Sequence, residues 1–163
     1  MERFLHWPGH AWLALPARLY LGGVFVLACL HKIAHPEVFA LDVATYDILP
    51  LWSINAMAIT LPWLELVAGV MMIVGFRARA AALAISGMMT MFVVAVLIAL
   101  SRGIDMSCGC FASQAAAEHD VISWLTVARD IAWLALGLYV VVFDLRPIGI
   151  DRITYHSQSR TLL

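Results

Sequence analysis

The sequence predicts an all-α integral membrane protein, a bundle of four spanning helices with both chain ends in the cytoplasm. Of its 163 residues, 63% are hydrophobic and 13% are charged, whereas soluble domains are usually about half apolar and about a quarter charged. Spanning backbone must satisfy its own hydrogen bonds, which favours helices over open sheets. The net charge of −1 gives no indication of nucleic-acid binding. The length and the absence of a linker sequence indicate one domain, 1–163.

Four apolar segments are long enough, or nearly long enough, to cross a bilayer. We expect spans at about residues 17–34, 53–76, 80–101 and 121–143, followed by a short cytoplasmic tail at 144–163. The first is marginal against the need for about 20 apolar residues. The second is interrupted only by Glu65, the third carries no charge, and the fourth carries Arg129 and Asp130 in its first half.

The basic residues orient these spans. Seven of the ten fall on one side, namely Arg3, Arg18, Arg77, Arg79, Arg146, Arg152 and Arg160. Lys32, Arg102 and Arg129 fall at or near the other side. Because cytoplasmic loops carry the excess of Lys and Arg, both termini are expected inside the cell and the loops at 32–52 and 102–120 outside. The chain is therefore expected to be a multi-pass protein of the bacterial inner membrane.

The second outward loop carries a pair of cysteines, Cys108 and Cys110, separated by Gly109. Glycine lets the backbone turn tightly enough for the sulfurs to meet, and a disulfide across so short a ring is strained and readily reduced. Cys29 lies in an apolar run and is expected to be a buried small hydrophobe. One C-x-C offers too few ligands for a closed zinc site, so no metal site is assigned.

Polar residues inside the spans form the second group of candidate site residues. Glu65 lies about 12 residues into its span, roughly 18 Å along a helix and near the bilayer middle. A carboxylate at that depth is expected to be protonated or paired, and the candidate partners are Arg129 and, nearer the cytoplasmic end, Arg18. With Lys32 and Asp130, these residues indicate either a substrate or quinone pocket beneath the cysteine loop or a clasp that fixes the bundle. Lys32 either favours a nearby thiolate or snorkels to the interface.

Short motifs follow one another along the four spans. They are Arg18-Leu19-Tyr20-Leu21-Gly22, Lys32 with Pro36, Tyr46 with Leu49-Pro50, Pro62-Trp63-Leu64-Glu65 with Gly69, Cys108-Gly109-Cys110-Phe111, and Arg129-Asp130. In this order they resemble the MauE branch of the DoxX superfamily. The chain departs from the family pattern at Ala112, where glycine is common, and at Asp130, where asparagine is common.

The resemblance implies a four-helix membrane bundle associated with redox or thiol chemistry. MauE proteins are linked to disulfide formation during maturation of periplasmic methylamine dehydrogenase, and other DoxX relatives to thiosulfate:quinone oxidoreduction. A shared fold does not fix an activity, so the motifs leave the choice of reaction open.

Three functions follow from these observations. The first is a thiol–disulfide oxidoreductase whose catalytic Cys108 and Cys110 exchange disulfides or electrons with a periplasmic redox partner, with quinone as the candidate cofactor. The second is an accessory subunit of a larger, respiratory-type membrane complex, with a structural disulfide and small residues that permit close helix contact. The third, a small transporter or metal-handling protein, lacks a visible inverted repeat.

Overall fold

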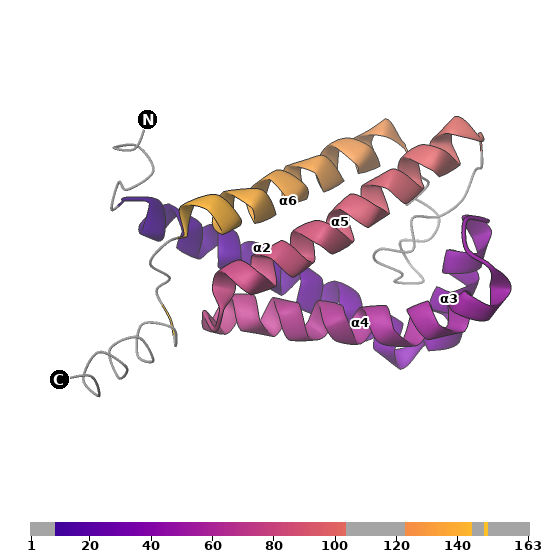
Figure 1. Ribbon diagram of the computed structural model, residues 1–163, viewed down its shortest axis with the longest axis horizontal. Coiled ribbons are helices and arrows are strands. Elements are labelled where there is room, and N and C mark those ends of the chain that lie inside the picture. Colours follow the sequence, from indigo (N-terminus) through magenta and orange to yellow (C-terminus); the bar gives the residue numbers. More distant parts are fainter. Residues whose placement is uncertain (1–8, 104–122, 145–148, 150–163) are drawn as a thin grey trace.

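The structure is a computed structural model that describes residues 9–103, 123–144 and 149, and these residues form helices and short connections (Figure 1). The helices are α2 (Gly9–Ala34), α3 (Pro36–Thr45), α4 (Leu51–Val74), α5 (Ala78–Ser101) and α6 (Trp124–Phe143). Four of them are long and apolar enough to cross a membrane, the first over Trp12–Ala34. The predicted all-α class with four spanning helices is confirmed.

Local sequence signals explain where these helices begin and end. Pro36 is the first residue of α3, where its missing N–H costs nothing and its fixed φ suits a helix. α4 ends at Gly75, whose φ of 73° is left-handed and whose N–H donates to the carbonyl of Met71, as a glycine C-cap does. At α6, the Ser123 hydroxyl accepts from the Thr126 N–H while the Thr126 hydroxyl accepts from the Ser123 N–H, a reciprocal capping box.

α3 is a finding that the sequence analysis missed, because residues 32–52 were treated as a loop. Its Phe39 and Val43 are one helical turn apart and pack with Ile54 and Ala58 of α4. A short helix is stable here because its apolar face is buried against a longer neighbour.

The helix pairs α2–α4 and α5–α6 lie close together in one half of the bundle and diverge from each other in the other half (Figure 1). α4 and α5 spread apart from their shared turn, and α3 lies beside the far part of α4 (Figure 1). We call the region next to the turn between α4 and α5 the turn half, and the region next to α3 the α3 half. In the turn half, Leu21, Met72, Ile85 and Val140 belong to the main core cluster, and none of the four side chains is exposed.

An arginine clasp joins three helices in the turn half. Arg18 of α2 donates from Nε and Nη2 to the carbonyl oxygen of Met72 in α4, at 3.2 and 3.1 Å. Its Nη1 donates to Oδ2 of Asp144, directly after α6, at 3.3 Å. Arg18 is 1% exposed and Asp144 0%. The expected polar tail therefore begins with a buried, helix-anchoring carboxylate.

Candidate functional site: a cavity in the α3 half

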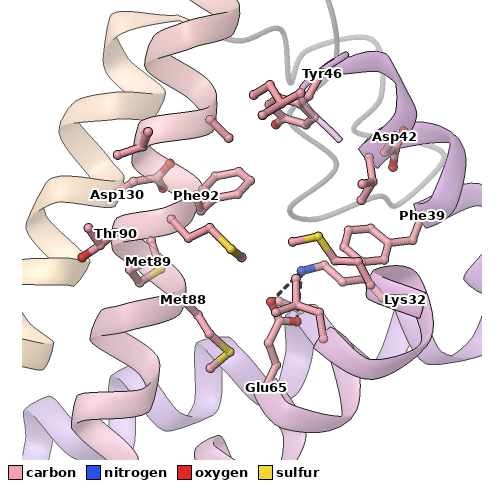
Figure 2. Close-up of a pocket in the computed structure, with 18 of the residues that line it drawn as sticks. Lys32, Phe39, Asp42, Tyr46, Glu65, Met88, Met89, Thr90, Phe92 and Asp130 are labelled. Carbon is pink, nitrogen blue, oxygen red and sulfur yellow. Dashed lines mark hydrogen bonds and ion pairs between the residues drawn. The ribbon is translucent and has the colours of Figure 1, made fainter. Parts of the chain in front are cut away.

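A cavity of about 350 Å³ lies in the α3 half and is lined by side chains from all five described helices (Figure 2). Its wall is mainly apolar and aromatic. The polar side chains that line it are those of Lys32, Asp42, Tyr46, Glu65, Thr90 and Asp130. The volume falls at the lower end of the range of about 300–1,000 Å³ that is usual for small-molecule sites.

α3 lies where the long helices diverge, and its side chains form part of the cavity wall. α3 rests on α4, while Tyr46, which directly follows it, packs across the opening against Val96 and Ala99 of α5 and Val127 of α6. The Tyr46 ring also stands edge-on to Phe92, with centroids 6.5 Å apart. Tyr46 therefore links α3 to α5 and α6 at one side of the cavity, and Figure 2 shows it above Phe92 and Lys32.

A buried ion pair forms one wall of the cavity. Nζ of Lys32 donates to both carboxylate oxygens of Glu65 at 3.0 Å, and each side chain is 9% exposed. The same Nζ lies 4.9 Å from the centroid of the Phe39 ring, within the range of a cation–π contact. One ammonium thus joins α2, α3 and α4 at the cavity wall.

The structure gives Glu65 a different partner from the two that the sequence suggested. α2 packs along α4, which brings Lys32 to Glu65, whereas α6 packs mainly on α5 and α2. Nε of Arg129 instead bonds Oδ1 of its neighbour Asp130 at 3.2 Å. Arg129 also stacks over Trp133, with Cζ 4.9 Å from the ring centroid. Glu65 pairs with Lys32 because α2 lies next to α4, and its depth in the membrane did not predict this partner.

The predicted site residues therefore separate into groups. Lys32, Glu65 and Asp130 all line the cavity, and Arg129 reaches its edge through Asp130. Arg18 is bound to Met72, seven residues or roughly 10 Å along α4 from Glu65. It is absent from the cavity lining, so its contacts are those of a clasp.

Sequence reasoning missed Thr90 of α5 and two polar cavity residues at α3, Asp42 and Tyr46. The signal that could have found the two at α3 is Pro36 followed by the apolar spacing of Phe39 and Val43, which predicts a helix that carries Asp42 toward the bundle. Burial raises the pKa of the Asp42 carboxyl above its ordinary value, while His31 and Lys32 act in the opposite direction. Cys29 is 0% exposed, which confirms that it is a buried small residue.

Cys108 and Cys110 lie outside the described residues, but the two ends of their segment are placed. α5 ends at Ser101, and α6 follows directly after Ser123. Arg102 donates from Nη1 to the carbonyl oxygen of Asp47 at 3.2 Å, which ties the end of α5 to the α3–α4 connection. The described residue next to the cysteine segment at the end of α5 therefore lies by the α3–α4 connection.

Comparisons with known proteins agree with one another. A family model described as "Methylamine utilisation protein MauE" matches residues 10–143. A protein of that description from Paracoccus denitrificans is 32% identical over 141 residues, which are 86% of this chain and 73% of the relative. One from Methylorubrum extorquens is 33% identical over 123 residues, 75% of this chain and 64% of the relative. No solved structure matches the chain.

Proposed function

This chain belongs to the MauE family of methylamine utilisation proteins, and from that premise we propose that it is a thiol–disulfide oxidoreductase of the bacterial inner membrane. Cys108 and Cys110 are the reacting groups and a periplasmic thiol protein is the partner. The family and the four apolar helices indicate a multi-pass membrane protein of the methylamine utilisation system. The proposal specifies its reaction and an orientation with both termini in the cytoplasm.

The observation that carries the proposal is the position of the described residues that flank the cysteine segment. Gly103 and Ser123, which flank segment 104–122, adjoin α5 and α6, and both helices line the cavity that contains the Lys32–Glu65 pair. Arg102 bonds the carbonyl oxygen of Asp47. With the termini inside, this end of the bundle faces the periplasm, where disulfides persist. A buried ion pair within a spanning bundle is itself a sign of a functional site.

The exchange balances without a further reagent. A thiolate of the partner attacks one sulfur of the Cys108–Cys110 disulfide and forms a mixed disulfide, and the other sulfur leaves as a thiolate. The partner's second thiol then attacks the mixed disulfide and releases the remaining cysteine. The partner gains a disulfide, and the chain keeps two thiols with the two electrons and two protons that came with them. It must then be reoxidised by a two-electron acceptor.

Single-cysteine variants test this exchange. Cys108→Ser and Cys110→Ser each leave one sulfur of the pair, and we expect at least one of them to accumulate a reductant-sensitive adduct with a periplasmic protein in native membranes. The doubly substituted chain should form no adduct and should not support methylamine-dependent growth of a host that lacks its own copy. Cys29→Ala is the matched control and should behave as the unmodified chain.

The opposite result would favour an accessory subunit. If the double variant supports full growth and neither single variant forms an adduct, the cysteines are not the reacting groups. A pair that stays oxidised under mild reductant in native membranes would instead be a structural disulfide.

A further inference from the structure

The ion pair on the cavity wall has bonding capacity that helix packing does not use. An ammonium carries three N–H donors, and among the described residues Glu65 accepts from Lys32 through two oxygens. Burying such a pair is costly, and apolar residues of similar size often stabilise a fold equally well. The Arg18 clasp already fixes α2 to α4. Lys32 and Glu65 are therefore placed to contact a ligand in the cavity.

The cavity reaches the surface that lipid covers. Met91 and Val94 line it and are 44% and 50% exposed on α5, a helix able to span the membrane. Exposed apolar side chains on a helix that crosses the membrane are in contact with lipid. The site therefore suits a lipid-soluble molecule rather than one taken from water.

The polar groups restrict the chemistry of that ligand further. Lys32 is the one basic side chain among the described residues that line the cavity, too few for a cofactor with several phosphates. It offers a donor to a carbonyl oxygen, and Asp42, Glu65 and Asp130 offer acceptors in the same cavity. The aromatic rings of Phe92 and Tyr46 offer edges and faces to a flat ring.

We propose that this cavity binds the ring of a quinone and that the quinone reoxidises the Cys108–Cys110 pair. This inference rests on the proposed function for the source of its electrons. Two thiols form one S–S bond and release two electrons and two protons, and the quinone takes up both pairs to become a quinol. The ring oxygens accept hydrogen bonds before reduction and donate them afterwards, which matches a cavity that holds both an ammonium and carboxylates.

A photoreactive azido-quinone with a ten-carbon tail tests the site on the full chain in lipid nanodiscs. Ala95 lines the cavity on α5, and Ala95→Phe fills it with a ring. Ala84 is exposed on the same helix and is absent from the cavity lining, so Ala84→Phe is the matched control. We expect labelling that excess unreactive quinone displaces, mapped to cavity residues, and at least about tenfold weaker in Ala95→Phe alone.

Two further results decide between the site and the proposed function. The Cys108→Ser/Cys110→Ser double variant should label as the unmodified chain does, because binding does not need the sulfurs. Labelling of the unmodified chain that unreactive quinone does not displace, or that maps only to lipid-facing residues such as Leu83, overturns the quinone site and leaves the thiol exchange standing. Displaceable labelling of equal strength in Ala95→Phe and Ala84→Phe also overturns the quinone site. If Ala95→Phe does not fold, the position of the label on the unmodified chain decides whether the cavity is the binding site.

Discussion

Two buried ion pairs on α2 differ in what surrounds them. Arg18 and Lys32 are fourteen residues apart, roughly 21 Å along the helix. Arg18 holds a carbonyl of α4 and the carboxylate after α6 in a closely packed core. Lys32 holds Glu65 at the wall of a cavity of about 350 Å³. The same type of interaction therefore acts as a clasp in the turn half and as part of a candidate site in the α3 half.

The turn half is packed more closely than the α3 half because the backbones of α2 and α4 approach each other there at two glycines. A Cβ on Gly22 of α2 would lie 2.9 Å from the Gly69 carbonyl oxygen of α4, and one on Gly69 would lie 3.0 Å from the Gly22 oxygen. Small residues allow this close contact in lipid. Farther along, Lys32, Phe39 and Glu65 occupy the interface, and the helices leave room for a ligand.

The largest expected effect comes from breaking the clasp. Arg18→Met removes the guanidinium from a fully buried carboxylate, and loss of one partner of such a pair typically costs about 3–5 kcal/mol. We expect a large drop in the thermal unfolding midpoint of the protein in detergent, partly restored by also making Asp144→Asn. An unchanged midpoint in Arg18→Met would show that this pair is not the structural one.

The glycine contact should have the next largest effect. Gly22→Ala puts a methyl group 2.9 Å from a carbonyl oxygen and 2.7 Å from the Ile73 side chain, and overpacking of this kind costs about 1–3 kcal/mol. A Cβ on Gly23 meets nothing within 4 Å, so Gly23→Ala is the matched control. It should be neutral or raise the midpoint, because alanine is the better helix former. Equal destabilisation by the two variants would contradict the close-contact interpretation.

Breaking the Lys32–Glu65 pair should affect binding more than stability. Lys32→Met leaves Glu65 at the wall of a cavity rather than in a closely packed core, so the midpoint should fall less than in Arg18→Met. Quinone labelling should fall about tenfold, the loss expected for one hydrogen bond to a charged donor. Parallel unfolding and labelling measurements check this difference. A loss of stability equal to that of Arg18→Met, with unchanged labelling, would make both pairs clasps.

The smallest expected effect is a pH dependence at Asp42. Burial raises the pKa of this carboxyl, so the folded chain binds the proton more tightly than the unfolded chain. That contribution to stability is present below about pH 4, near the ordinary aspartate value, and is lost as the pH rises through the raised pKa. Asp42→Asn should flatten the fall in unfolding midpoint over this window. An unchanged slope would show that Asp42 does not titrate differently on folding.

The same comparison explains what could be predicted from the sequence. Apolar length and charge predicted the four spanning helices, and the structure sets two of their ends by local caps at Ser123 and Gly75 that the sequence analysis did not use. The need of Glu65 for a cation was also visible. Its identity was not, because helices that face lipid are apolar on all sides and their sequence does not state which neighbour each face meets. The cavity depends on α3, which is too short to span a membrane and whose signals, Pro36 and the spacing of Phe39 and Val43, lie in a segment treated as a loop.

The central claim is that electrons from the cysteine pair reach a quinone in the cavity. The most direct test reduces the purified chain in nanodiscs, adds a quinone, and traps the remaining thiols with maleimide for mass analysis against a Cys29→Ala background. The account predicts that Cys108 and Cys110 lose two hydrogens as one quinol forms, in the unmodified chain and in Ala84→Phe but at least about tenfold more slowly in Ala95→Phe. Cysteines that stay reduced beside quinone, or that oxidise equally fast in all three chains, would contradict it.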